Sequence, residues 1–412
     1  DEWVAQLEGR KRRRNGPWGR LLDAWERLPF SARLLLGLGL LLLLPLLTAT
    51  GPFLSLTGAA SNAFVLSTLN RFLVFAMLAI GLTVVVGYAG LLDLGYVAFY
   101  GLAGYLYAYT SSGFVRAFGP EGVHLPSLVS VPLIVLGVAG IGWLLGATSL
   151  RLSGDYLAIV TLGFGQVFVQ LALTLTRVQV PGVARPVDLT GGPNGINRLD
   201  DISVFGYTFS GGLQYYYLLL TLLALVFWAV YNLSRSRIGR AWRAIREDEL
   251  AAEVMGAPSA RLKLLAFAVG AGIAALAGTV DAAWQGSVVP VPRYSALTLI
   301  NLYAMIVLGG TGSLVGAVLG AFIFTVLPEV LRDVALSSYL FYGGVVLGLL
   351  AALRPRARLL RVLGGALLLG LALKGAALLW PALDAAQGAL PGGSPLNALA
   401  RSLLVLPQDY VT

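Results

Sequence analysis

Ten apolar stretches, each close to the length of a membrane-spanning helix, constrain the fold of this 412-residue chain more than any other feature. A helix crosses a bilayer with about 20 apolar residues. The stretches occupy residues 31–50, 63–86, 91–110, 127–148, 156–176, 214–231, 264–285, 296–309, 312–331 and 338–353. Because 57% of the residues are hydrophobic and only 12% are charged, the chain has too little polar surface for a soluble domain. The pattern predicts an all-α, polytopic transmembrane bundle of about ten spans.

The distribution of basic residues predicts the orientation of this bundle. With the N-terminus in the cytoplasm, 20 of the 29 Lys and Arg residues fall on the cytoplasmic side and six on the opposite side. Cytoplasmic loops of membrane proteins carry an excess of Lys and Arg. The bias therefore supports both the number of spans and a cytoplasmic N-terminus.

Three parts of the chain differ in composition. Residues 1–33 are basic and cytoplasmic, and form either an amphipathic interfacial helix or a solvated tail. Residues 34–355 form the transmembrane domain, and residues 356–412 form a C-terminal extension. Within the extension, 362–380 is either an eleventh span or an interfacial helix, because Lys374 interrupts it and a central Lys costs about 2.5–3.5 kcal/mol.

The scarcity of reactive side chains argues against an enzyme. The chain has no cysteine and one histidine, His124, so we expect no catalytic triad, no metal site and no cofactor. Ionisable residues near the spans are few and lie mostly at span ends, which argues against a proton relay. The basic residues follow membrane loops, and we expect no binding of nucleic acid.

Glycine clusters interrupt three of the spans. They begin at Gly87, Gly163 and Gly309, and the stretches 91–110, 156–176 and 296–309 are accordingly expected to be irregular or short. Two interpretations remain open for each cluster: a broken helix that lines a cavity, or close packing through small residues. The first and third clusters share a coarse pattern, which suggests an internal repeat of the kind that builds transporters.

The cytoplasmic loop 232–263 is longer than a connector between spans needs to be. Apolar residues recur at helical spacing from Ile238 to Met255, and Gly256 and Pro258 follow as stop signals. Basic residues dominate the first half and acidic residues the second. The pattern predicts one helix of about four turns that docks into a groove of a partner, or else lies on the bilayer.

Five blocks of sequence, in order across about residues 60–355, resemble the branched-chain amino acid ABC permease family of the LivM type. They are GYAGLLDLGYVAFYGLAGYLYA, LRLSGDYLAIVTLGFGQ, LTGGPNGI, GRAWRAIREDELAAEVMGAPSARLKLLAFAVGAGIAALAGT and YAMIVLGGTGSLVGAVLGA. The resemblance implies a bacterial inner-membrane protein with a homologous second permease, two cytoplasmic ATP-binding subunits and an extracytoplasmic substrate-binding protein as partners. Gln166, and Val291 to Arg293, depart from acidic residues that the family commonly has there.

The resemblance makes the loop 232–263 the coupling loop to the ATPase. It implies that Glu249 forms a salt bridge with an ATPase arginine, that Ala252 allows close approach and that Gly256 ends the helix. The expected coupling residues are Arg246, Glu249, Ala252, Glu253 and Gly256. No Lys of the chain is followed by Ser or Thr, so the chain has no P-loop and another subunit must hydrolyse ATP.

An aliphatic amino acid needs an apolar wall and hydrogen-bond donors for its carboxylate, and unwound helix ends supply such donors. We therefore expect the Gly-rich segments to line the substrate path. The candidates are Tyr88, Asp93, Tyr96, Tyr156, Thr161, Gly163, Gly165, Asn301 and Thr311. The favoured function is the permease subunit of an ABC importer for branched-chain or related hydrophobic amino acids. The alternatives are the same architecture with another small solute, such as urea, an amide or a sugar, and a secondary transporter that works alone.

Overall fold

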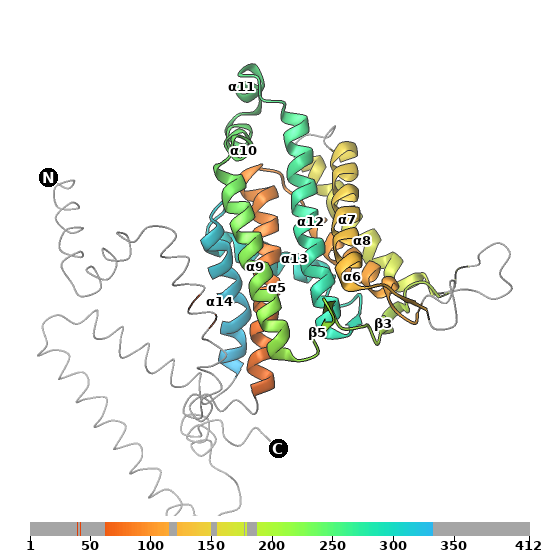
Figure 1. Ribbon diagram of the computed structural model, residues 1–412. Helices are drawn as coiled ribbons and strands as arrows, with labels where there is room; N and C mark the ends of the chain where they lie inside the picture. The colour runs from red at the N-terminus through yellow and green to blue at the C-terminus, as the bar shows by residue number, and fades with distance from the viewer. Residues whose placement is uncertain are drawn as a thin grey trace, which may run out of the picture. The chain divides into compact units, whose positions relative to one another are not determined.

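The computed structural model describes residues 62–114, 122–149, 155–176 and 188–332, together with three single residues outside these ranges. The predicted spans at 31–50 and 338–353, the basic segment 1–33 and the extension 356–412 lie outside the described residues. The described part is mostly helical, which confirms the predicted helical class (Figure 1). Its helices are α5 (Asn62–Leu82), η1 (Thr83–Tyr88), α6 (Tyr96–Thr110), α7 (Ser127–Ser149), α8 (Asp155–Thr174), η3 (Gly192–Asn194), α9 (Gly212–Arg235), α10 (Arg237–Glu247), α11 (Glu249–Val254), α12 (Ser259–Gln285), α13 (Ala296–Gly309) and α14 (Leu314–Arg332).

Five of the described segments are long and apolar enough to cross a membrane. They are Phe64–Tyr88, Ser127–Thr148, Tyr156–Thr174, Gly212–Arg235 and Ser259–Gln285. Each lies within a few residues of a predicted span, and α13 and α14 are shorter apolar helices. The total of about ten spans remains a prediction, because two of the ten lie outside the described residues and the predicted spans at 91–110, 296–309 and 312–331 correspond to the shorter helices α6, α13 and α14.

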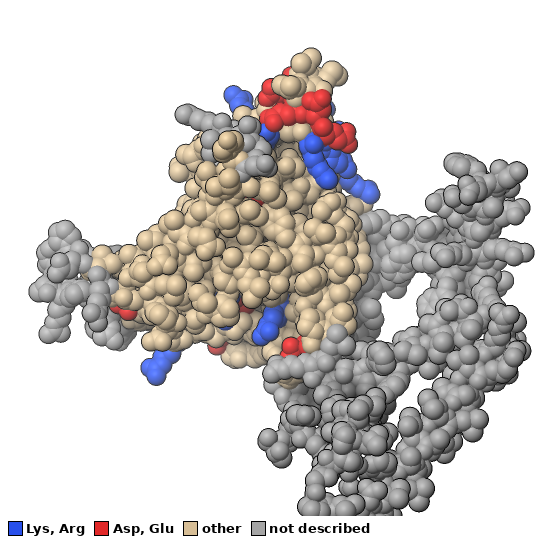
Figure 2. Space-filling model, turned by 180° about the vertical axis from the view of Figure 1, so that it is seen from behind, with Lys and Arg blue, Asp and Glu red and all other residues tan. Residues whose placement is uncertain are grey.

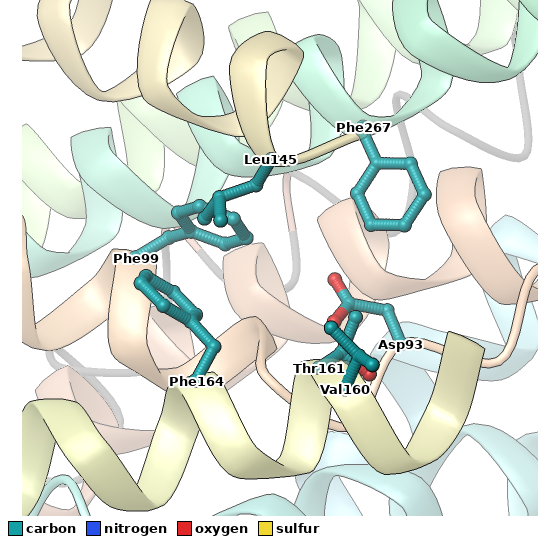
Figure 3. A pocket seen from close by; sticks show the side chains of 7 residues that line it. All are labelled: Asp93, Phe99, Leu145, Val160, Thr161, Phe164 and Phe267. Atoms are coloured by element: carbon teal, nitrogen blue, oxygen red, sulfur yellow. The ribbon is translucent and has the colours of Figure 1, made fainter. Parts of the chain in front are cut away.

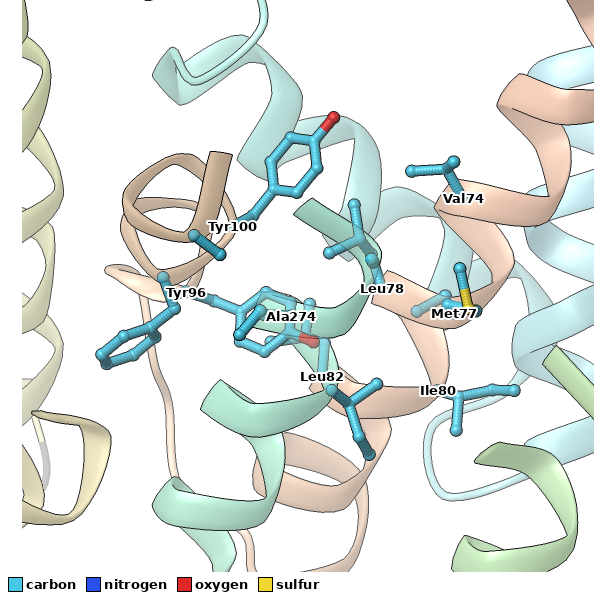
Figure 4. Close-up of a cluster of buried hydrophobic side chains, with 14 of the residues drawn as sticks. Val74, Met77, Leu78, Ile80, Leu82, Tyr96, Tyr100 and Ala274 are labelled. Atoms are coloured by element: carbon cyan, nitrogen blue, oxygen red, sulfur yellow. The ribbon is translucent and has the colours of Figure 1, made fainter. Parts of the chain in front are cut away.

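The core lies where α5 and α12 meet. In the most apolar part of the α5–η1 span 83% of the residues are buried, whereas in that of α7 only 22% are. Helix α5 is therefore central and α7 peripheral. Helix α12 packs against α5, α6 and α7, and α5 also contacts α9 and α14. Figure 4 shows Leu78 and Leu82 of α5, Tyr96 and Tyr100 of α6, and Ala274 of α12 gathered in this core.

Glycine allows the closest helix contacts. A Cβ at Gly278 of α12 would lie 2.2 Å from the carbonyl oxygen of Tyr100 in α6. A Cβ at Gly320 of α14 would lie 1.9 Å from the carbonyl oxygen of Met305 in α13. Small residues let membrane helices approach backbone to backbone. Much of the third glycine cluster therefore serves close packing, one of the two interpretations that the sequence left open.

The first glycine cluster breaks the chain between two helices. Helix α5 ends in the π-helical turn η1, residues 89–95 are not helical, and α6 starts only at Tyr96. The prediction of a span over 91–110 was therefore too long at its start. The second cluster behaves differently, because α8 runs without interruption through Gly163 and Gly165, and the prediction that 156–176 is irregular or short is wrong.

The other predicted elements give one agreement and one difference. Helix α13 is short, as expected for 296–309. The loop 232–263 holds two helices and not the single one predicted, because Asp248 adopts an extended conformation and caps α11 by accepting a hydrogen bond from Ala251 N at 3.0 Å. Aspartate is among the residues preferred at this capping position.

Short antiparallel strand pairs collect at the end of the helices opposite α10 and α11 (Figure 1). Strand β1 (Ser111–Ser112) pairs with β2 (Val123–His124), and β4 (Ser203–Val204) pairs with β5 (Tyr207–Thr208). Strand β3 (Ile196–Asn197) pairs with β6 (Ser287–Val288), which ties the loop before α9 to the end of α12.

Candidate functional site

The helix pair α10–α11 is anchored by one face of α10. Trp242 and Ile245 are buried, and the Trp242 indole N–H donates to the carbonyl of Leu262 in α12 at 2.7 Å. The apolar residues between Ile238 and Met255 do not form one continuous buried face, because Ala252 is buried whereas Met255 is 87% exposed. The break at Asp248 thus turns the apolar residues of α11 away from the anchored face.

An exposed apolar tip results at α11. Its members are Leu250, Val254 and Met255, and Val254 is 88% exposed. Glu247, Asp248, Glu249 and Glu253 surround the tip with negative charge, and Figure 2 shows this acidic group at the top of the molecule. The middle of the same face carries almost no charge. An apolar patch with a charged rim is typical of a protein interface.

The predicted coupling residues occupy different places in this helix pair. The Lys263 ammonium group lies 2.5 Å from Glu249 Oε1, so the Glu249 carboxylate already has a partner within the chain, although its side chain is 45% exposed. Glu253 accepts a hydrogen bond from the Ser259 hydroxyl. Gly256 has φ +87° directly after the last turn of α11, which a residue with a Cβ rarely adopts, and it ends the helix as predicted.

Arg246 points from α10 into the membrane domain. Its guanidinium Nη1 donates to the carbonyl of Gly87 in η1 at 2.5 Å. A Cβ at Gly90 would lie 2.7 Å from Arg246 Cγ, and a Cβ at Gly312 would lie 3.3 Å from Nη1. Gly87 and Gly312 also meet, since a Cβ at Gly87 would lie 2.9 Å from Gly312 Cα. Arg246 therefore connects the α10–α11 pair with both the first and the third glycine cluster.

The segment between η1 and α6 is held by two other helices. The N–H of Leu94 donates to Thr161 Oγ1 of α8 at 3.0 Å. The Tyr303 hydroxyl of α13 donates to the carbonyl of Asp93 at 2.7 Å. Side chains far away in sequence thus replace the helical hydrogen bonds that the segment lacks, as irregular backbone at membrane depth requires.

The Asp93 side chain faces a small cavity. Figure 3 shows its carboxylate among apolar side chains from α6, α7, α8 and α12. The cavity has a volume of about 20 Å³ and is lined by Asp93, Phe99, Leu145, Val160, Thr161, Phe164 and Phe267. Of the predicted path residues, only Asp93 and Thr161 line it.

The other path candidates are scattered. Tyr88 and Tyr96 are buried, and a Cβ at Gly165 would lie 3.5 Å from both Gly95 Cα and Leu94 O. Tyr156 is 68% exposed, and Gly163 faces open space. Asn301 and Thr311 lie on α13 and in the turn after it and do not line this cavity. The sequence reasoning missed Tyr303, because its contact with Asp93 joins residues 210 positions apart in the sequence. It also missed Phe164, which stands between Gly163 and Gly165 in the sequence.

A second polar cluster ties the strand-bearing end together. Asp281 of α12 is buried, accepts a hydrogen bond from the Tyr100 hydroxyl and lies 3.8 Å from Arg293 Nε. Arg293 also donates to the carbonyl of Ser287 at 2.9 Å. Burial alone would lower the pKa of the Arg293 guanidinium, but the Asp281 carboxylate raises it, and the net pKa lies above its ordinary value. Arg293 therefore stays charged.

The described residues hold no metal-ligand cluster. No group of three or more His, Asp or Glu residues among them is arranged to bind a metal. His124 lies 2.5 Å from Asp200 in a half-exposed pair at the strand-bearing end. Neither observation supplies a catalytic arrangement within the described ranges.

Comparison with known proteins identifies the family. Residues 64–380 match the model of the family described as branched-chain amino acid transport system / permease component. The chain is 36% identical to the high-affinity branched-chain amino acid transport permease LivM of Escherichia coli over 318 residues, 70% of each chain. It is 27% identical to the branched-chain permease BraD of Pseudomonas aeruginosa, over 64% of this chain and 84% of the relative.

A more distant relative is named for a different substrate. The ribose import permease RbsC of Haemophilus influenzae is 27% identical, over 67% of this chain and 79% of the relative. No solved structure matches the chain. The family match covers most of the sequence, including every helix described above except the start of α5, and the chain belongs to the branched-chain amino acid transport permease family.

Proposed function

We propose that this chain is the permease subunit of an ABC importer that moves branched-chain or related hydrophobic amino acids across the bacterial cytoplasmic membrane. The observation that carries the proposal is the α10–α11 pair. It offers an exposed apolar tip with an acidic rim, and Arg246 links it to the unwound segment of the membrane domain. A surface that docks a partner and also contacts the non-helical segment of the membrane domain is suited to transmit a conformational change driven by ATP hydrolysis in that partner.

The proposed assembly has four kinds of subunit. A homologous permease completes the membrane domain, and of the two ATP-binding subunits one docks at the tip of α11 of this chain and the other on the homologous permease. An extracytoplasmic binding protein delivers the substrate at the strand-bearing end. A relative named as a second branched-chain permease, LivH of Escherichia coli, is 28% identical to this chain and supports pairing of homologous permeases.

The proposed topology keeps about ten spans, an internal repeat and a cytoplasmic N-terminus. The five described spans and the separation of α10 and α11 from the strands support this topology. The predicted coupling and path residues belong to the proposal as well. Among the path residues, Asp93 and Thr161 receive the best support because they share a cavity.

Another cargo is the second candidate. The match to a ribose import permease favours the same architecture with a sugar or another small neutral solute. Transport without an ATPase is less well supported, because the exposed apolar tip with its acidic rim is suited to dock a partner subunit.

The test is uptake of radiolabelled leucine by cells that carry the complete transporter. We expect uptake that stops when the ATPase subunit is inactivated, and competition by isoleucine and valine but not by ribose or urea. Glu249→Ala and Gly256→Val are expected to abolish uptake while leaving membrane insertion intact. Lys263→Ala is the matched control, since it removes the intramolecular partner of Glu249 and leaves the docking carboxylate. Leucine uptake that continues without ATP would exclude the ABC mechanism.

A further inference from the structure

The Asp93 carboxylate has one oxygen without a partner. Its side chain is 1% exposed, and Oδ1 accepts a hydrogen bond from the N–H of Gly95 at 2.9 Å. Among the described residues nothing donates to Oδ2, and no Lys, Arg or His forms an ion pair with Asp93. A buried carboxylate without a partner is costly, and either protonation or a bound cation removes that cost.

The cavity that Asp93 faces has the size of one small polar group. Its volume of about 20 Å³ holds one water-sized group. An ammonium head group has nearly the size of a water molecule, whereas a carboxylate or a sugar ring is larger. Chemistry and size therefore both select a small cation.

The walls favour an organic ammonium group over a hydrated metal ion. The rings of Phe99, Phe164 and Phe267 line the cavity, and Figure 3 shows them around the carboxylate. The faces of aromatic rings attract ammonium groups. Apart from Asp93 and Thr161, no lining residue has a side-chain oxygen that would replace the water of a metal ion.

The carboxylate is positioned before any ligand arrives. Thr161 and Tyr303 hold the backbone on both sides of it, through Leu94 N and the Asp93 carbonyl. Val160 lines the cavity and is 44% exposed, so the cavity lies next to the exposed face of α8.

We infer that Asp93, with Phe99, Phe164 and Phe267, binds the α-ammonium group of the transported amino acid. This inference rests on the proposed amino-acid function and adds to it the group that the membrane domain recognises. A solute without an amino group would lack this contact, so the cavity contributes specificity inside the membrane domain.

The first test measures binding by the purified full chain in detergent. Methylammonium chloride is expected to raise the Tm of the wild-type chain, because a ligand that binds only the folded state stabilises it. Potassium chloride at equal ionic strength is expected to raise it less. Asp93→Asn keeps the acceptor for Gly95 N and should lose the difference, whereas Asp281→Asn, at the other buried carboxylate, should keep it. Equal shifts with both salts, or an unchanged difference in Asp93→Asn, would overturn the inference.

The second test separates this inference from the proposed function. In cells with the complete transporter, Asp93→Asn is expected to raise the KM for leucine at least about tenfold, because a hydrogen bond to a charged group is lost. Membrane insertion of the variant is measured in parallel. Absence of leucine uptake by the wild type would refute the proposed function. Normal wild-type uptake with an unchanged KM in Asp93→Asn would refute only the ammonium site.

Discussion

At the scale of single residues, Arg246 carries the most information. The sequence placed it among residues that face the ATPase, on a helix with several other arginines. The structure directs its guanidinium to Gly87 O, next to Gly90 and Gly312. These glycines leave room for the Arg246 side chain, which explains why residues without a Cβ stand at these positions. The sequence pattern alone does not show this.

Arg246→Gln is expected to uncouple transport from ATP hydrolysis. The variant loses a charge-assisted hydrogen bond worth about 1.5–3 kcal/mol, so motion of α10 no longer reaches η1. We expect leucine uptake to fall about tenfold or more while ATP hydrolysis by the assembled transporter continues. Both rates are measured on the same proteoliposomes.

Arg240→Gln provides the matched control on the same helix. Arg240 donates only to the carbonyl of Arg235, near the start of the helix pair, and does not contact the glycine junction. Its substitution should leave the ratio of uptake to hydrolysis unchanged. A loss of coupling equal to that of Arg246→Gln would mean that the effect comes from general loss of positive charge.

At the scale of elements, sequence reasoning succeeded where the local pattern decides. Length and hydropathy located α7, α8, α9 and α12 within a few residues, and Gly256 marked the end of α11. At Gly163 and Gly165 it left a broken helix and close packing open, and α8 continues through both glycines. It overextended α6 because the partners that stabilise residues 89–95 lie on α8 and α13.

The contact between α6 and α12 depends on Gly278. Gly278→Ala is expected to lower the free energy of unfolding by about 1–3 kcal/mol, the usual cost of overpacking, because the new Cβ would lie 2.2 Å from Tyr100 O. Gly272→Ala on the same helix is the control, since its nearest neighbour would be Ala139 Cβ at 3.5 Å, an ordinary contact. Thermal unfolding of the purified chains compares them, and equal Tm values would contradict the prediction.

At the largest scale that the structure describes, the charged residues on the face in Figure 2 lie mostly toward two opposite ends, and the surface between them is largely uncharged. This arrangement agrees with the membrane orientation that the basic residues indicate, but which end faces the cytoplasm remains a prediction. Phe205, between β4 and β5, is 91% exposed, and Val254 lies at the tip of α11. A label at Phe205 therefore reports the accessibility of the strand-bearing end, and a label at Val254 that of the end formed by α10 and α11.

Cysteine labelling tests the orientation directly, because the chain has no cysteine of its own. Phe205→Cys should react with a membrane-impermeant maleimide in intact cells. Val254→Cys should react only after permeabilisation. The reverse pattern would invert the topology, and with it the proposed sites of the ATPase and the binding protein.

The single extended residue at Asp248 has a consequence for how such transporters diversify. Trp242 fixes α10 to α12, whereas the apolar tip beyond Asp248 makes few contacts with the membrane domain. Within 249–255, Ala252, Glu249 and Glu253 contact the rest of the chain, whereas Leu250, Val254 and Met255 are exposed. Under the proposed function, substitutions at these three exposed positions are expected to alter which ATPase the permease accepts, and a chimaera that takes them from a paralogue should keep its cargo.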